Sequence, residues 1–172
     1  MVLSYKYSRE EIKGTTVSKL AKRETKDCVV RAMAVALNLP YDTAHGFVKE
    51  TMKREDRKGT KQLHIDEAME KFQESGLELV GRRYEVKVLE GLDIKNAYKL
   101  RGEVILRKKT VKSFIKSHQK GTFVISVAGH TFTIKDGVLI DNIGEEFRPT
   151  RKVQAAYKIE DTLSKNQLSF EF

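Results

Sequence analysis

Helical spacing of apolar residues dominates the first half of the chain. Residues 28–38 (CVVRAMAVALN) are apolar on almost every side and predict a buried helix, with Asp27 at the position of its N-cap. A second helix is expected to begin at Pro40, and a third spans about residues 64–75, ending at Gly76. The first two helices are separated by so few residues that we expect them to pack as a hairpin.

The segment before these helices carries weaker signals. Residues 2–7 (VLSYKY) alternate weakly and predict a strand. Ser8 followed three residues later by Glu11 has the pattern of a capping box and predicts a short helix.

After Gly76 the pattern changes to the alternation of strands. Short β-rich pieces (LELVG, RYEVKVLE and EVILRK) are followed by a helix that Thr110 is expected to cap, and then by strands TFVISV, HTFTIK and VLI. The Asp136-Gly137 dipeptide predicts a tight hairpin between the last two. Further strands are expected from Val153 (VQAAYKI) and in the tail (LSFEF). Helices first and strands last predict an α+β fold, which we interpret as one domain over residues 1–172.

Composition narrows the class of protein. The chain has 172 residues, a formal net charge of +9 and one cysteine, which excludes an intrachain disulfide and zinc sites built from several cysteines. It contains no nucleotide-binding or metal-binding motif, so we expect no metal and no cofactor. No apolar run is long enough to span a membrane, and the first residues lack the pattern of a secretory signal. The sequence therefore predicts a cytoplasmic protein.

The positive charge is concentrated in one window. Residues Lys95 to Lys120 contain nine basic residues and one acid, Glu103, so that this window holds +8 of the net charge of +9. Such a patch can bind nucleic acid or an acidic protein. Since only Tyr98 and Phe114 are aromatic, and no nucleic-acid-binding motif accompanies the charges, a solvated face is the favoured interpretation over nucleic-acid binding.

Three residues form a candidate catalytic group. Cys28 lies at the first turn of the buried helix, where free N–H groups and the positive end of the helix dipole stabilise a thiolate. His130 begins a strand, and Asp141 follows on the return strand of the hairpin. With the turn at residues 136–137, Asp141 lies diagonally beside His130 on one face, whereas Asn142 points to the other, so Asp141 is preferred as the residue that orients the imidazole. We interpret His45, His64 and His118 as structural.

The segments DCVVRAMAVALNLPY and KSHQKGTFVISVAGHTFTIKDGVLIDN resemble those of small papain-like cysteine peptidases. They are similar to papain-fold proteins common in bacteriophage genomes and to the peptidase domains of bacteriocin exporters. The resemblance implies a papain-like fold, with Cys28 as nucleophile, His130 as general base and Asp141 as third member. These peptidases carry a Gln shortly before the nucleophile as an oxyanion donor. Here that position is Lys22, so Lys22, Thr25 or the backbone N–H of Cys28 are the candidate donors.

The function expected from these residues is thiol-dependent hydrolysis of an amide, most simply by a cysteine peptidase acting on a protein or peptide. The first alternative is a catalytically inactive papain-fold binding or structural protein that uses the basic window Lys95–Lys120. The second alternative is a papain-fold acyltransferase or deamidase with the same three residues. The substrate and the oligomeric state do not follow from the sequence.

Overall fold

The computed structural model describes residues 3–142 and 147–162, and its architecture is α+β. A seven-stranded sheet has the order β1-β8-β7-β6-β9-β3-β2, in which β1 runs parallel to β8 and the other neighbours are antiparallel. A separate two-stranded sheet pairs β4 with β5. The strands are β1 (Tyr5–Tyr7), β2 (Leu77–Leu79), β3 (Arg82–Val88), β4 (Lys95–Leu100), β5 (Glu103–Lys108), β6 (Thr122–Val127), β7 (His130–Lys135), β8 (Val138–Asp141) and β9 (Ala155–Asp161).

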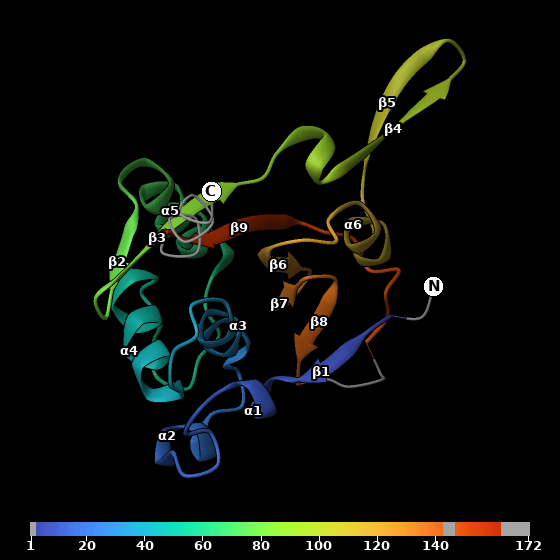
Figure 1. Ribbon diagram of the computed structural model, residues 1–172. Coiled ribbons are helices and arrows are strands. Elements are labelled where there is room, and N and C mark those ends of the chain that lie inside the picture. Colours follow the sequence, from blue (N-terminus) through green and yellow to red (C-terminus); the bar gives the residue numbers. More distant parts are fainter. Residues whose placement is uncertain (1–2, 143–146, 163–172) are drawn as a thin grey trace, which may run out of the picture.

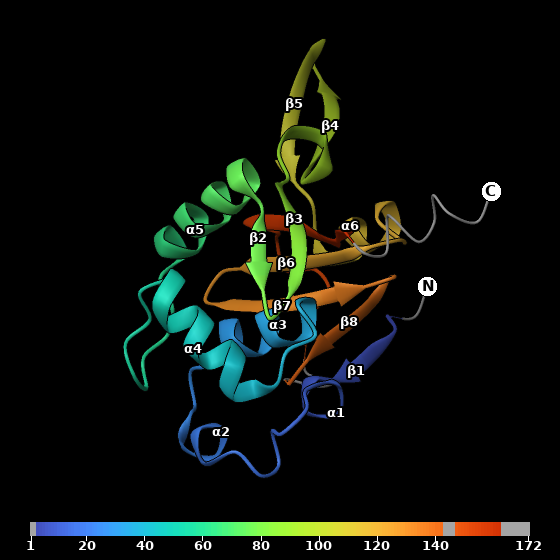
Figure 2. The ribbon, with the colours of Figure 1, turned by 60° about the vertical axis from the view of Figure 1, so that its left-hand side comes forward.

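Helices cover both faces of the large sheet (Figure 1). Helices α3, α4 and α5 share one apolar core with the sheet, and α6 shares a second core on the other side. The helices are α1 (Ser8–Glu11), α2 (Lys19–Arg23), α3 (Cys28–Ala36), α4 (Tyr41–Thr51), α5 (Gln62–Ser75) and α6 (Val111–Ser117), with a 3-10 turn η1 (Gly91–Asp93) before β4. Figure 2 shows α4 and α5 side by side with β2 and β3, whereas α6 lies on the other side of the sheet.

The alternation of side chains along the central strands builds these two cores. In β6, Val124 packs in the core of α3 to α5, whereas its neighbours Phe123 and Ile125 pack in the core of α6. Successive side chains of a strand point to opposite faces, so a strand that is apolar at nearly every position must be covered on both sides. The near-continuous apolar run TFVISV therefore accounts for its central place in the sheet.

Helix α3 lies against the middle of the sheet. The hydroxyl of Thr133 on β7 donates a 2.7 Å hydrogen bond to the carbonyl of Ala32, which ties the helix to the strand that begins at His130. After the helix, Asn38 adopts a left-handed conformation (φ 52°), a geometry that closes many helices, and Pro40 precedes α4. The hairpin of α3 and α4 that the sequence predicts is confirmed.

A buried ionic cluster fixes the segment that leads to α3. Arg54 donates hydrogen bonds of 3.3 and 2.5 Å to the two carboxylate oxygens of Glu24, and His45 Nε2 lies 3.1 Å from Glu24 Oε1. Burial raises the pKa of Glu24, but the hydrogen bonds and charges of Arg54 and His45 outweigh it and lower this pKa below its ordinary value. The cluster anchors the chain four residues before Cys28, and it accounts for the structural assignment of His45.

Most of the predicted elements are confirmed, including the α+β architecture and the hairpin that turns at Asp136-Gly137. Strand β4 was not predicted, because it alternates too weakly and is exposed on both faces. The tail segment LSFEF lies outside the described residues.

One capping prediction is wrong and one is confirmed. Ser8 is the first residue of α1 instead of its cap, and its hydroxyl donates to the side chain of Asn142 at 3.0 Å. Asp27 occupies the N-cap position of α3 as predicted, but its side chain makes no capping hydrogen bond, because it accepts from Arg31 and Tyr41 instead.

Candidate active site

The tight hairpin of β7 and β8 brings His130 and Asp141 together. Their register pairs Lys135 with Val138 and Thr133 with Ile140, so that the first residue of β7 and the last residue of β8 lie at the same end of the sheet. His130 Nε2 is 2.6 Å from Asp141 Oδ2. This distance is that of a strong hydrogen bond between an imidazole and a carboxylate.

Asp141 makes two further hydrogen bonds, one through its carboxylate and one through its backbone carbonyl. Its Oδ1 accepts a 2.7 Å hydrogen bond from the backbone N–H of Asn142, and its backbone carbonyl accepts a 2.6 Å hydrogen bond from the hydroxyl of Tyr5 on β1. The side chain of Asn142 is bonded to Ser8. The carboxylate of Asp141, and not the amide of Asn142, is therefore the group placed beside the imidazole.

Cys28 lies next to this pair although it is about a hundred residues away in the sequence. It is the first residue of α3, is partly exposed, lines the same cleft as His130, and lies close enough to the ring to raise the pKa of His130. Because Nε2 faces Asp141, Nδ1 is the ring nitrogen left for the thiol. The first-turn N–H groups of α3 are not capped by Asp27, so they and the helix dipole favour negative charge at the sulfur. The structure thus brings the three predicted residues together.

The electrostatics of these three residues favour a protonated imidazole. Burial lowers the pKa of His130, but its hydrogen bonds and charge interactions with Asp141 and Cys28 outweigh burial and raise this pKa to about 9. At neutral pH the imidazole therefore holds a proton next to the sulfur. An imidazolium so placed stabilises a thiolate and can later deliver its proton to a leaving group.

Asp27 is the other carboxylate next to Cys28, and its charge is balanced. Its Oδ2 accepts a 2.9 Å hydrogen bond from Arg31 Nε and a 2.7 Å hydrogen bond from the hydroxyl of Tyr41. Burial together with this bond raises the pKa of Tyr41, which keeps the phenol protonated as a donor. Asp27 therefore ties α3 to α4, and Arg31 offsets the negative charge that would otherwise oppose a thiolate at Cys28.

The three residues line an open cleft of about 710 Å³. One wall is formed by the loop around Gly59 and Thr60 and the start of α5 at Gln62, and the other includes the turn 127–129 and Gln154. The sequence does not predict that these residues lie near Cys28, because they come from segments that meet only in the folded chain. The cleft has the size of a site for a small molecule or a peptide side chain.

The candidate oxyanion donors differ in whether they line the cleft. Thr25 and Cys28 line the cleft. Lys22 lies on α2, is exposed and is not among the residues that line the cleft. The backbone N–H of Cys28, at an uncapped helix start, and the side chain of Thr25 are thus the candidate donors that belong to residues of the cleft.

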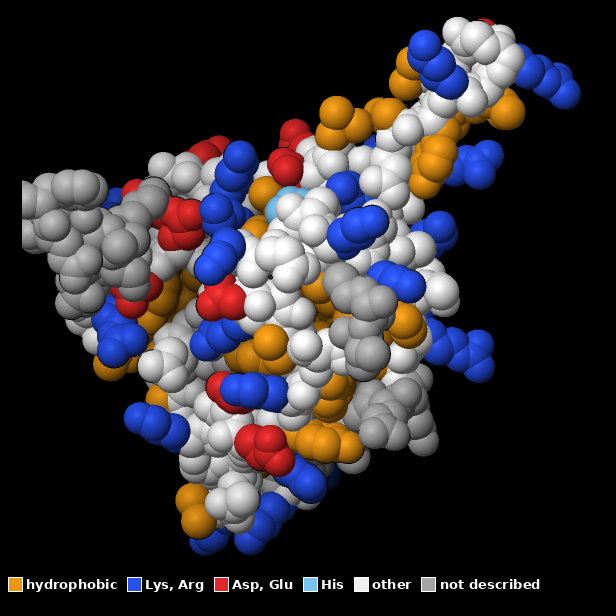
Figure 3. All heavy atoms as spheres, turned by 45° about the vertical axis from the view of Figure 1, so that its right-hand side comes forward, with side chains coloured by type: hydrophobic (Ala, Val, Ile, Leu, Met, Phe, Trp, Pro, Cys, Tyr) orange, Lys and Arg blue, Asp and Glu red, His pale blue; other side chains and the backbone are white. Residues whose placement is uncertain are grey.

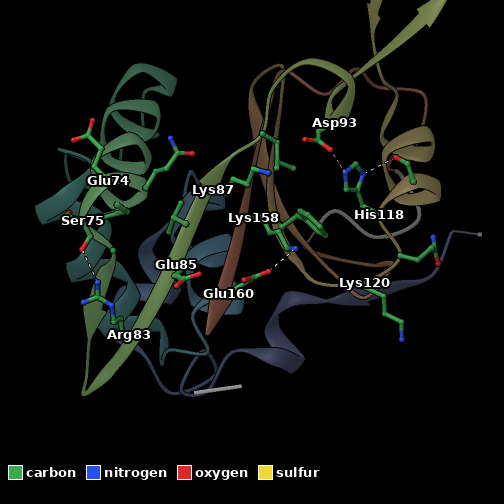
Figure 4. A pocket seen from close by; sticks show the side chains of 18 residues that line it. Glu74, Ser75, Arg83, Glu85, Lys87, Asp93, His118, Lys120, Lys158 and Glu160 are labelled. Atoms are coloured by element: carbon green, nitrogen blue, oxygen red, sulfur yellow. Dashed lines mark hydrogen bonds and ion pairs between the residues drawn. The ribbon is translucent and has the colours of Figure 1, made fainter. Parts of the chain in front are cut away.

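A second cleft, of about 830 Å³, lies over β3 and β9 between α5 and α6 (Figure 4). There Ser117 Oγ is 2.9 Å from His118 Nδ1, and His118 Nε2 is 3.5 Å from Asp93 Oδ1. The order of serine, histidine and aspartate is that of a catalytic triad with a serine nucleophile. However, His118 Nδ1 and the Ser117 hydroxyl each also lie 3.1 Å from the carbonyl of Phe114. Both groups are thus engaged as donors to the helix end, in agreement with a structural His118.

Residues 3–142 and 147–162 contain no group of three or more His, Cys, Asp or Glu side chains placed to hold a metal ion. Among the same residues, no helix combines the length and the apolar character that a membrane span requires.

Comparison of the chain with protein families, with curated proteins and with solved structures finds no match.

Proposed function

We propose that this protein is a thiol-dependent amide hydrolase with a papain-like arrangement, most simply a cysteine peptidase. The observation that carries the proposal is the hydrogen-bonded pair of His130 and Asp141 with the Cys28 thiol next to it in one open cleft. A cysteine at the start of a helix, with a histidine and a carboxylate on two neighbouring strands, resembles the papain-like cysteine peptidases in arrangement as well as in sequence.

The first half of the reaction forms an acyl-enzyme. The Cys28 thiolate attacks the carbonyl carbon of the amide, and the electron pair of the C=O bond moves to oxygen, where the N–H of Cys28 donates to it. The His130 imidazolium then gives its proton to the leaving nitrogen as the C–N bond breaks. An amine departs, and the acyl group remains on sulfur as a thioester.

The second half restores the enzyme. Neutral His130 takes a proton from a water molecule, whose oxygen attacks the thioester carbon, and the C–S bond breaks to release the acid and the thiolate. Asp141 keeps the ring in one orientation through both halves and stabilises the imidazolium each time it forms. Amine acceptors in place of water would give acyl transfer by the same steps.

The test is to incubate the full chain with a library of peptides and to identify new termini by mass spectrometry. We expect new termini with the wild-type chain and none with Cys28→Ala or His130→Ala. His64→Ala removes a histidine of α5 outside the cleft and serves as the matched control, which should retain activity. New termini that persist in Cys28→Ala would contradict the proposal, and products joined to an added amine would assign the transferase alternative.

A further inference from the structure

The sequence favoured a solvated face for the basic window, but the window does not lie flat on the body of the protein. Most of it forms the β4–β5 hairpin, which stands away from the rest of the molecule (Figures 1 and 2). We call residues 95–108 the arm. Its base is fastened by a 2.9 Å hydrogen bond from Lys109 N to the Ile94 carbonyl and by a 3.1 Å hydrogen bond from Asn96 Nδ2 to Ser113 Oγ.

Positive charge is concentrated on one face of the arm and at its tip. In the antiparallel register Lys95 opposes Lys108 and Lys99 opposes Val104, which places the three lysines on one face, called the lysine face. The other face carries one positive and one negative side chain, Arg107 and Glu103, and has no net charge. The tip carries Arg101. A partner that complements this charge must therefore present negative charge to the lysine face and to the tip.

Large apolar side chains are exposed between these charges. Their exposed fractions are 50% for Tyr98, 50% for Leu100, 66% for Val104 and 49% for Leu106. A two-stranded hairpin without a covering layer is only marginally stable in water, and exposed apolar groups framed by charges mark interaction sites. The arm thus has the composition of a binding element.

We propose that the arm binds duplex DNA by entering the major groove. This groove is about 12 Å wide and admits a two-stranded β-ribbon, and the phosphate backbones that flank it lie within reach of lysines on the face that enters. Six residues per strand give a length of roughly 20 Å, and Val104 and Leu106, which share the lysine face, can contact thymine methyl groups on the groove floor.

Other nucleic acids fit less well. The major groove of duplex RNA is too narrow and deep for protein side chains to read. Single strands are bound through stacking on aromatic rings, and the one aromatic ring of the arm, Tyr98, lies beneath Arg107.

The surface of the body at the base of the arm carries further positive charge. Lys112 and Lys116 are exposed on α6, which lies at the base of the arm. Figure 3 shows Lys and Arg side chains along the arm and on the surface below it. These lysines are placed to meet the phosphates that flank the groove.

The experiment measures binding of the full chain to a fluorescent mixed-sequence DNA duplex by anisotropy at several salt concentrations. The arm variant combines Lys99→Gln, Arg101→Gln and Lys108→Gln, all at exposed positions. The control variant combines Lys13→Gln, Lys19→Gln and Arg23→Gln, which are also exposed and remove the same charge from the end of the molecule opposite the arm. Circular dichroism verifies that both variants are folded.

We expect salt-sensitive binding to DNA, with a log–log slope that falls by about 2 to 3 in the arm variant, since each lost phosphate contact contributes about 0.9. The control should keep the wild-type slope, and an RNA duplex of the same sequence or polyglutamate should compete weakly. Equal loss in both variants, equal competition by RNA or polyglutamate, or no binding to DNA at low salt would overturn the proposal. Because Cys28 is absent from the arm, its alkylation should be the same in both variants, which keeps this test independent of the proposed peptidase function.

Discussion

Replacing Asp141 with Asn is the sharpest test of the electrostatics of the site. The substitution keeps the size of the side chain and removes the negative charge 2.6 Å from His130 Nε2. Without that charge the imidazolium is less stable, and the neutral pair of thiol and imidazole competes with the ion pair of thiolate and imidazolium. We expect alkylation of Cys28 by iodoacetamide to become slower near neutral pH.

The magnitude follows from the pKa of His130. The rise from the ordinary value of 6.5 to about 9 corresponds to about 3 kcal/mol in favour of the imidazolium. This stabilisation comes from Asp141 and from Cys28 together, so the loss of Asp141 removes roughly half of it or more. The ion pair should then be about 10- to 100-fold less populated, and alkylation at about pH 7.5 slower by the same factor.

The assay is the rate of alkylation across the pH range, with mass spectrometry of the modified peptide. At about pH 10 the imidazole of His130 is largely neutral in both proteins, so the charge of Asp141 no longer acts through an imidazolium and the two should react at similar rates. Asp93→Asn removes the carboxylate beside His118 and is the matched control, with an unchanged profile. Equal rates of wild type and Asp141→Asn near pH 7.5, or a loss that is uniform at every pH, would refute the reasoning.

The same pKa predicts a dependence of stability on pH. Because the pKa of His130 is raised in the folded chain, its contribution to the free energy of unfolding is complete below about pH 6.5 and is lost as the pH rises through about 9. Urea denaturation at a series of pH values should show a larger decline over this window in wild type than in Asp141→Asn.

Three further predictions concern the framework of the site. Tyr41→Phe removes the buried 2.7 Å hydrogen bond to Asp27 and should lower the free energy of unfolding by about 1–3 kcal/mol in urea denaturation, without abolishing alkylation of Cys28. Glu24→Gln leaves the buried Arg54 without its counter-charge and should destabilise the fold by about 3–5 kcal/mol. The pKa of Glu24 is lowered, so its contribution is present above about pH 4.5 and lost on acidification, and the two proteins should converge in stability at low pH. Ile134→Ala opens a cavity in the core under α6 and should cost about 2–5 kcal/mol, and a cost below about 1 kcal/mol would contradict the packing described.

The sequence by itself determined the elements whose signals are local. The Asp136-Gly137 turn sets the register of β7 and β8, and that register alone places Asp141 and not Asn142 beside His130. The apolar run after Cys28 likewise determines a buried helix with the cysteine at its start. Such features follow from residues within one turn or one strand of each other, which is the range over which hydrophobic period and turn chemistry act.

Only the tertiary structure decided what depends on residues far apart in the chain. The approach of Cys28 to His130 requires α3 to lie against β7, where the buried Thr133 hydroxyl meets the helix, and no spacing encodes that contact. The cleft walls at Gly59 and Gln154 and the parallel pairing of β1 with β8 are of the same kind. The basic window between Lys95 and Lys120 had the composition of an ordinary solvated face, and the fold turned most of it into a projecting ribbon, because β4 and β5 pair with each other instead of joining the large sheet. Local patterns specify which side of an element is buried, but the partner that buries it is chosen by the packing of the whole chain.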